Sequence, residues 1–248
     1  MKKRAAELRD EILFKQPESS CYGDCPICCL PVPIDPEKST LYPCCGKRIC
    51  RGCSYANGKR EREGGLQYNC PFCRKTAPRG DEEVNELLMK RVEVNDPVAI
   101  CHFGTDGYNK GDFEKAVEYW TRAASLGDAE AHYQLSRLYH EGVGVEKDKK
   151  SELYHAEKAA IAGHPEARHN LACVVGGHDG PARAVKHFII AAKLGYDHSL
   201  DALKELYKDG LVSKDVFSAA LLGYQTAIEA AKSPQREEAY LRAPKKGM

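Results

Sequence analysis

Apolar residues recur at helical spacing over most of the chain, and residues 21–78 are the exception. Residues 1–20 carry a short amphipathic pattern that predicts an N-terminal helix followed by a linker. In residues 81–96 the apolar positions stand three or four apart, which predicts a connecting helix with Asp81 as its N-cap. Residues 232–248 are polar and are expected to form a C-terminal tail.

An internal repeat fills residues 97–231. Three segments of small residues end at Gly127, Gly163 and Gly195, spaced 36 and then 32 positions apart, and a weaker fourth copy ends at Gly223. Each period fits two amphipathic helices joined by a turn, and glycine after the second helix supplies a C-cap conformation that other residues resist. One such hairpin cannot bury its apolar face alone, so stacked copies predict an all-α helical-repeat solenoid.

The second copy, between Ala129 and Gly163, follows the pattern Ala-x-Ala…Leu…Tyr…Gly-x-Gly-Val…Asp…Lys…Tyr…Ala-Ala…Gly. This pattern resembles the Sel-one-like repeat family, which is related to the tetratricopeptide repeats. The first copy is equally similar to a tetratricopeptide repeat, and the third lacks the Gly-x-Gly-Val turn. The resemblance covers roughly residues 97–225 and implies a scaffold that binds a protein substrate or an adaptor.

Composition restricts the class of protein. The chain has 248 residues, 29% of them charged, and a net charge of only +1. A nucleic-acid or membrane-surface protein would usually show a strong basic excess, so neither kind of partner is expected. The apolar runs are too short to cross a bilayer, and the basic N-terminus leads into acidic residues rather than an apolar core. A soluble protein of the cytosol or nucleus is therefore the expectation.

Cysteine is concentrated in one segment: ten of the twelve cysteines lie between Cys21 and Cys73. In a reducing compartment, clustered cysteine pairs indicate metal sites. Eight cysteines form four pairs, which are Cys25/Cys28, Cys44/Cys45, Cys50/Cys53 and Cys70/Cys73. Zinc takes four tetrahedral ligands, and a C-x-x-C turn places two sulfurs on one ion, so four pairs predict two Zn²⁺ ions. Spacing alone does not show which pairs share an ion.

The order of these pairs resembles the RING finger family in its all-cysteine form. The resemblance implies a small zinc-stabilised α+β cross-brace over residues 21–78. The first and third pairs then share one zinc, and the second and fourth share the other. One departure is that Cys44 and Cys45 are adjacent, whereas the family usually separates these two ligands. Cys21 or Cys29 could replace one of them, although Cys44 and Cys45 are the preferred ligands.

Both sites would be closed, because all four positions on each ion are filled by protein sulfurs. A closed site leaves no position for water or substrate, which argues against metal-assisted hydrolysis and makes the zinc ions structural. Structural zinc contributes about 10–16 kcal/mol at neutral pH to such small folds. No catalytic residue is expected in this chain.

The resemblance further implies a ubiquitin ligase, which binds a ubiquitin-conjugating enzyme carrying ubiquitin and promotes transfer without a covalent intermediate of its own. Ile27 would be the apolar anchor for the conjugating enzyme, and Pro71 would line the same shallow groove. Arg74 would hydrogen-bond both ubiquitin and its carrier through its planar guanidinium. On the helix after Cys53, where many ligases carry a large contact residue, the candidates are Tyr55 and Asn57.

A competing hypothesis is a non-enzymatic interaction scaffold. Isoleucine and proline inside zinc loops can serve only to pack the module, and an exposed arginine beside a cysteine is common. The two hypotheses differ in whether the chain supports ubiquitin transfer, which an assay can decide.

Overall fold

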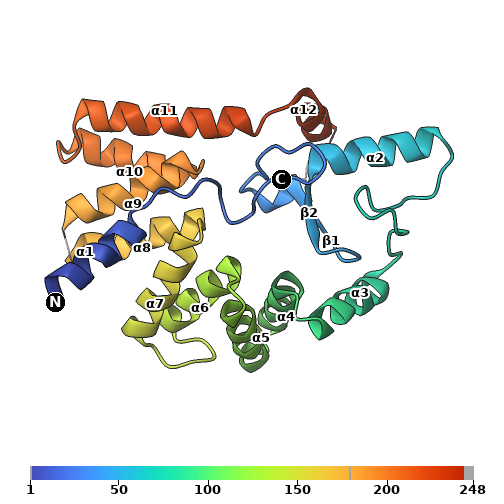
Figure 1. Cartoon of the computed structure of the whole chain (residues 1–248), viewed down its shortest axis with the longest axis horizontal. Helices are drawn as coiled ribbons and strands as arrows, with labels where there is room; N and C mark the ends of the chain where they lie inside the picture. Colours follow the sequence, from blue (N-terminus) through green and yellow to red (C-terminus); the bar gives the residue numbers. More distant parts are fainter. Residues whose placement is uncertain (1, 179, 243–248) are drawn as a thin grey trace. The chain divides into compact units, whose positions relative to one another are not determined.

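The computed structural model describes residues 2–178 and 180–242 (Figure 1). The contacts divide the chain into two compact units, and each unit joins segments that are distant in sequence. We call residues 2–21 with 100–228 the repeat unit, and residues 22–99 with 229–242 the cysteine unit. None of the helices in the described residues has an apolar stretch long enough to cross a membrane.

The repeat unit is a helical solenoid, as the periodicity predicts. The helices of the solenoid are α4 Pro97–Asn109, α5 Phe113–Ser125, α6 Ala129–Glu141, α7 Lys149–Ile161, α8 Pro165–His178, α9 Pro181–Lys193, α10 Asp197–Lys208 and α11 Lys214–Ala230. Consecutive helices from α5 to α10 contact one another, which Figure 1 shows from green to orange.

The ends of these helices follow from local chemistry. The carboxylate of Asp128 accepts from the backbone N–H of Ala131 at 2.7 Å and so caps the start of α6. Gly127, Gly163 and Gly195 have φ angles of +86°, +83° and +93°, which confirms the expected glycine conformation after the second helix of each period. A side chain at Gly163 would also meet the Ser19 carbonyl oxygen, because a Cβ there would lie 2.8 Å from it.

Small residues let the paired helices approach closely. Ala160, Ala172 and Ala192 are completely buried and share one core with Leu171 and Phe188. Trp120 forms a second packing centre: its side chain is 1% exposed, and its Nε1 donates to the carbonyl oxygen of Cys101 at 3.2 Å. The solenoid is thus stabilised by apolar burial, in keeping with its amphipathic sequence.

The N-terminal segment is part of the repeat unit. Helix α1 (Lys2–Leu13) packs against α7, and Leu13 is 2% exposed within the repeat core. Arg168 donates to the Leu13 carbonyl oxygen, and Arg183 Nη1 donates to Asp10 Oδ2 at 2.6 Å. The expected linker after this helix also contacts the repeats, since the N–H of Cys21 donates to the Gly163 carbonyl oxygen at 3.0 Å.

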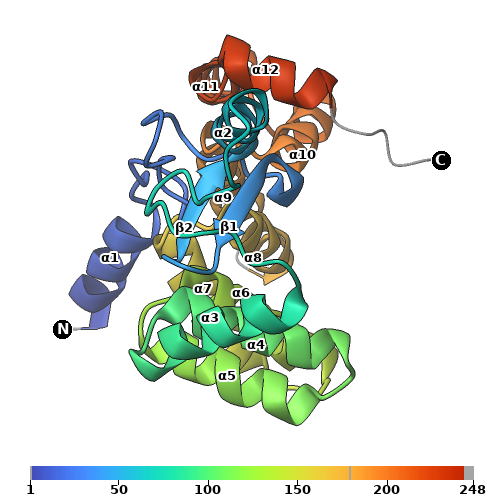
Figure 2. The same ribbon diagram turned by 90° about the vertical axis from the view of Figure 1, so that its right-hand side faces the viewer.

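Within the described residues, the cysteine unit combines one small hairpin with short helices. Strands β1 (Ser39–Tyr42) and β2 (Lys47–Cys50) form an antiparallel hairpin, preceded by the short helix η1 (Pro36–Lys38). Helix α2 (Arg51–Glu63) follows directly, beside the hairpin in Figure 2. Apart from cysteines, its buried core is formed by Val32, Tyr42 and Ile49, as the scarcity of large aliphatic residues predicts. Asp24 and Pro31 form an isolated bridge, as do Asn69 and Thr76.

Helix α3 (Asp81–Glu93) forms where the spacing predicts it, with one difference at its start. Its N-cap is Gly80, without a side-chain hydrogen bond, and Asp81 is the first helical residue. Asp81 still favours the helix through its charge, because an acidic group in the first turn interacts favourably with the positive end of the helix dipole. Leu88 and Val92 are buried, and the guanidinium of Arg91 packs over Gly46.

The expected C-terminal tail contains a helix instead. Helix α12 (Pro234–Leu241) packs against α2, as Figures 1 and 2 show. Ser233 caps it by accepting from the N–H of Arg236 at 3.2 Å, and Pro234 occupies the first turn, where a missing N–H costs nothing. Residues 243–248 of the expected tail lie outside the described residues.

Candidate metal centre

The structure brings eight cysteines together in two groups. In each group the sulfur atoms lie within 4.8 Å of one another. The first tetrad is Cys25, Cys28, Cys50 and Cys53, and the second tetrad is Cys44, Cys45, Cys70 and Cys73. The first and third pairs therefore meet, as do the second and fourth, which is the grouping that the resemblance implies. Either tetrad could hold a metal ion.

The distances between sulfurs fit a tetrahedral thiolate site. The Sγ atoms of Cys28 and Cys50 are 3.8 Å apart, as are those of Cys45 and Cys70, while Cys44 and Cys73 are 3.4 Å apart. Four sulfurs placed about 2.3 Å from a zinc ion at tetrahedral angles would lie about 3.8 Å from one another. None of the described cysteines forms a disulfide. The donor set is therefore suited to Zn²⁺.

The first tetrad is built where a strand ends and a helix begins. Cys50 is the last residue of β2 and the N-cap of α2, and its sulfur accepts from the N–H of Cys53 at 3.4 Å. The N–H of Cys50 donates in turn to the sulfur of Cys25 at 3.5 Å. The start of α2 thus orients two sulfurs toward the turn that carries Cys25 and Cys28.

The second tetrad uses the tip of the β1–β2 hairpin. The N–H groups of Cys45 and Gly46 donate to the Tyr42 carbonyl oxygen at 3.3 and 2.8 Å, and Gly46 has a φ angle of +65°. This tight turn brings the adjacent Cys44 and Cys45 to the same group of sulfurs. Among the described residues, no other cysteine joins either tetrad: Cys29 is exposed, and Cys21 belongs to the repeat unit.

Without a cation, the thiols within a tetrad cannot all be ionised. Burial raises the pKa of Cys45 to about 11 and that of Cys53 to about 12. A hydrogen bond from Cys50 lowers the pKa of Cys25 to about 4. One thiolate is therefore stabilised by neighbours that keep their protons. Binding of a divalent metal requires thiolates and releases those protons, so metal affinity rises with pH.

The predicted partner-binding residues lie within or directly after the turns Cys25–Cys28 and Cys70–Cys73, but they differ in exposure. Ile27 is 43% exposed, and Arg74 is exposed with a φ angle of +64°. Pro71 is buried, so its side chain packs within the loop and is not available to line a surface groove. Phe72 next to it is 43% exposed and has Lys47 5.8 Å from its ring centroid. Sequence reasoning therefore overlooked Phe72 as the apolar surface residue of this loop.

Asn57 has a structural role on α2. It is 8% exposed, and its Nδ2 donates to Glu61 Oε2 at 2.9 Å and to the Asn69 carbonyl oxygen at 3.0 Å. Glu61 is itself buried and accepts from the N–H of Asn69 at 3.2 Å. This pair connects α2 to the loop that leads into Cys70. Of the two candidates on this helix, Asn57 is therefore excluded as an exposed contact, and Tyr55 is half-buried.

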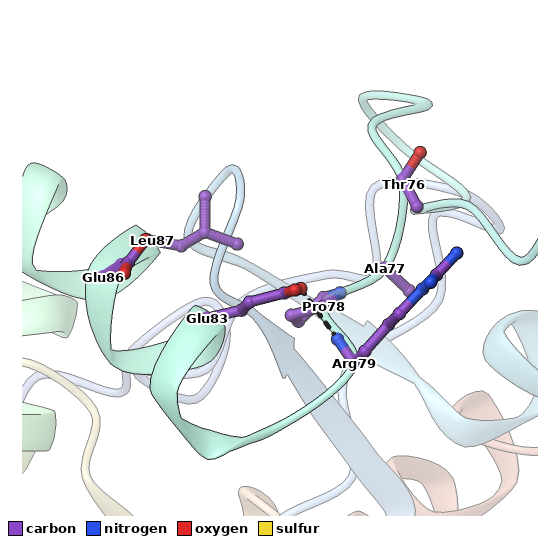
Figure 3. A pocket seen from close by; sticks show the side chains of 7 residues that line it. All are labelled: Thr76, Ala77, Pro78, Arg79, Glu83, Glu86 and Leu87. Carbon is purple, nitrogen blue, oxygen red and sulfur yellow. Dashed lines mark hydrogen bonds between the residues drawn. The ribbon is translucent and has the colours of Figure 1, made fainter.

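A hollow of about 370 Å³ lies where the cysteine loops lead into α3 (Figure 3). The N–H of Arg79 donates to Glu83 Oε2 across it at 2.9 Å. It is lined by Thr76, Ala77, Pro78, Arg79, Glu83, Glu86 and Leu87. The lining contains no thiol or imidazole, so this hollow adds nothing to the metal chemistry of the tetrads.

The model of the Sel1 repeat family matches three consecutive segments of the repeat unit, at residues 99–128, 129–164 and 165–196. Three Sel1 repeats occupy residues 99–196. The expected Sel-one-like repeats are thereby confirmed, including a third copy that lacks the Gly-x-Gly-Val turn. The Sel1 repeats make this part of the chain a protein-interaction scaffold.

Two solved structures are similar to this chain. The crystal structure of a Sel1 repeat protein from Oxalobacter formigenes has a TM-score of 0.52 and 21% sequence identity, covering 75% of this chain and 75% of that chain. A protective antigen of uropathogenic Escherichia coli strains with an SLR fold has a TM-score of 0.47 and 18% identity, covering 79% of this chain and 41% of that one. The first likeness supports the fold alone. No curated protein matches the chain.

Proposed function

We propose that the chain is a RING-type ubiquitin ligase. Its cysteine unit would bind a ubiquitin-conjugating enzyme charged with ubiquitin, and its Sel1 repeats would bind a substrate or an adaptor. The observation that carries this proposal is the interleaved grouping of the four cysteine pairs. A single metal centre would need only two pairs, whereas alternation of first with third and second with fourth is the cross-brace of the family that the sequence resembles.

With two closed tetrads, the metal ions would take no direct part in the reaction. Each ion would have four sulfur ligands, so the sites would hold the loops in place and offer no position to a reacting group. Transfer of ubiquitin would then depend on how the loops grip the charged carrier. Ubiquitin transfer to a lysine is an acyl transfer, and a bound carrier accelerates it by fixing the orientation of the reacting groups.

The surface proposed for this contact comes from the turns Cys25–Cys28 and Cys70–Cys73. Ile27 and Phe72 expose apolar side chains, one from the loop of each tetrad, and Arg74 follows directly after the last cysteine. Exposed apolar side chains flanked by a cation are typical of protein interaction sites. A guanidinium is suited to bridge two partners, because its donors fan out in a plane.

The test is an in vitro ubiquitination assay of the full chain with a panel of conjugating enzymes. Wild type is expected to form ubiquitin chains with at least one of them, and Ile27→Ala and Arg74→Ala are expected to lower the rate about ten-fold or more, an effect of about 1.4 kcal/mol. Leu66→Ala is the control, because Leu66 is a 62% exposed apolar residue that follows α2 and lies outside the C-x-x-C turns.

Zinc content is measured for every variant, so that loss of activity is not confused with loss of metal. The proposal fails if wild type is inactive with every conjugating enzyme. It also fails if both loop variants retain full activity with a full complement of zinc.

A second candidate is a scaffold without ligase activity, and one observation favours it. Asn57 lies on α2 where many ligases carry a large contact residue, yet it is small and buried. A scaffold of this kind would hold zinc and bind proteins through the Sel1 repeats, but would not stimulate discharge of ubiquitin from any carrier. The same assay separates the two functions.

A further inference from the structure

Arg236 is a buried cation beside the first tetrad. It belongs to α12, its residue is 1% exposed, and its guanidinium Nη2 donates to the sulfur of Cys28 at 3.4 Å. The two residues are 208 positions apart in sequence. Both belong to the cysteine unit, which includes the C-terminal segment.

The other partners of the guanidinium are backbone oxygens. Nη2 also donates to Leu30 at 3.2 Å, and Nη1 donates to Pro31 at 2.7 Å and to Ala231 at 2.6 Å. Leu30 and Pro31 directly follow the turn that carries Cys25 and Cys28. Arg236 thus fixes the backbone of the loop that supplies half of the first tetrad.

The charge of Arg236 has no carboxylate partner among the described residues, since every acceptor is a neutral carbonyl oxygen or the Cys28 sulfur. An unpaired buried cation is costly, so a counter-charge is expected nearby. Four thiolates around a zinc ion carry a net charge of about −2 and would supply it. Arg91, which packs over the hairpin tip beside the second tetrad, differs because it forms an ion pair with Asp96.

We propose that Arg236 is a positioning residue for the first zinc site. It balances the negative charge of the thiolate tetrad and holds Cys28 in place, which makes α12 a structural part of the metal centre. Hydrogen bonds from groups outside the ligand set orient the ligands and tune metal affinity, typically by about 10–100-fold. The second tetrad has no equivalent contact among the described residues, so the two sites should respond differently to the loss of Arg236.

Gly52 provides independent support for a close and specific fit of α12. It lies between Cys50 and Cys53 in the first turn of α2. A Cβ atom at Gly52 would lie 2.8 Å from Cγ of Arg236 and 2.9 Å from its Cα, closer than side chains pack. Gln235 Nε2 donates to the Gly52 carbonyl oxygen at 3.1 Å. Glycine therefore allows the backbone of α12 to approach the first tetrad.

Contacts along the rest of α12 hold it in the same position. Lys59 on α2 forms an ion pair with Glu238 at 3.2 Å, and Lys38 lies 5.5 Å from the ring centroid of Tyr240. With α12 docked in this way, Ile27 remains 43% exposed. The helix therefore supports the first tetrad while leaving the proposed contact residue for the conjugating enzyme available.

The inference rests on the metal sites of the proposed function, and its test measures zinc rather than ubiquitin transfer. Zinc-loaded full chain is challenged with excess chelating dye under reducing conditions, and zinc release is followed over time. In Arg236→Gln and Gly52→Ala, one zinc per chain should leave about 10–100-fold faster than in wild type, and the other at the wild-type rate. Arg236→Lys keeps the positive charge but lacks the planar set of guanidinium N–H donors. Its rate of zinc release should lie between those of wild type and Arg236→Gln.

Arg242→Gln is the matched control at the C-cap of α12, because Arg242 is exposed and, among the described residues, its ion pair is with Glu238 at 3.6 Å rather than with a cysteine. It should release zinc as wild type does. Brief alkylation followed by peptide mass spectrometry identifies the weakened site. In the Arg236 and Gly52 variants, early labelling should fall on the first tetrad, while the cysteines of the second tetrad stay protected.

Three outcomes would overturn the inference: unchanged release in Arg236→Gln, equally faster release of both zinc ions, or early labelling of the second tetrad. If Arg236→Gln cannot be isolated folded, Gly52→Ala and Arg236→Lys provide the same comparison. If wild type binds no zinc, the metal sites of the proposed function fail as well. If wild type binds two zinc ions but is inactive as a ligase, the inference stands without that activity.

Discussion

Cys44 and Cys45 show how a turn can bring two adjacent residues into one group of possible metal ligands. Side chains of neighbouring residues in an extended strand point to opposite faces, so an adjacent pair looks unsuited to a common ion. At the hairpin tip, however, two N–H groups converge on the Tyr42 carbonyl oxygen and Gly46 adopts a left-handed conformation. Both sulfurs then face Cys70 and Cys73.

This geometry predicts that Cys44 and Cys45 are both ligands. Cys44→Ser or Cys45→Ser should each lower bound zinc from about two to about one per chain, because a serine hydroxyl does not replace a thiolate ligand. Metal analysis of protein purified under reducing conditions measures this. Cys29→Ser, at an exposed position outside both tetrads, should keep both ions. A Cys44 or Cys45 variant with two tightly bound zinc ions would contradict the assignment.

At the scale of elements, α1 is a packed helix of the repeat unit. Leu13 lies in the same core as Leu171 and Phe188, whereas Leu8 on the same helix is 53% exposed. The carbonyl oxygen of Leu13 accepts from Arg168, which is completely buried. A helix that contributes a core residue and an acceptor for a buried cation is part of the fold.

Leu13→Ala should therefore lower the free energy of unfolding of the repeat unit by about 2–5 kcal/mol, through lost burial and the cavity left behind. Leu8→Ala should change it by less than about 0.5 kcal/mol, because an exposed side chain buries little on folding. Urea denaturation followed by far-ultraviolet circular dichroism measures both. Equal effects of the two substitutions would show that α1 is not packed as the structure has it.

The sequence predicts those elements whose signal is local. Repeated glycines, capping aspartates and apolar spacing predict the solenoid, because each period uses the same contacts between neighbours. Ser233 followed by Pro234 is also a local signal, typical of a helix start, and it was available to predict α12 within the polar tail. A short polar helix carries too little apolar pattern to outweigh the composition around it.

Long-range contacts were not predictable in the same way. The pairing of the cysteines followed from resemblance to a family, since spacing alone leaves several pairings open. Nothing near Arg236 indicates that its guanidinium reaches Cys28, because that contact depends on how α12 docks on α2. Pro71 and Phe72 show that burial within a loop was not predictable either. The turn of the loop decides which of these two neighbouring side chains is buried.

The whole molecule combines two kinds of stabilisation. The repeat unit buries alanine, leucine and phenylalanine side chains, as helical repeats usually do. The cysteine unit buries few apolar groups other than cysteines, so we expect its stability to depend largely on metal held by the two tetrads. The two units should therefore respond differently to removal of metal.

A strong zinc chelator should unfold the cysteine unit and leave most of the helical signal in place. The reason is that the solenoid contains no metal-type cluster among its described residues. Circular dichroism measures the helical content, and limited proteolysis with peptide mapping should show new cleavage between residues 22 and 80. Loss of the entire helical signal in one step would show that the solenoid depends on the metal sites.

The discontinuity of the cysteine unit has a consequence for biosynthesis. Its cysteine loops leave the ribosome before the repeats, but α12 is translated only after them. Domains generally fold in the order of their synthesis, yet this unit cannot be complete until the solenoid between its two parts has been made. Until then the first tetrad lacks Arg236, and its thiols are open to oxidation. Zinc capture in the nascent chain should therefore precede the final ordering of the site.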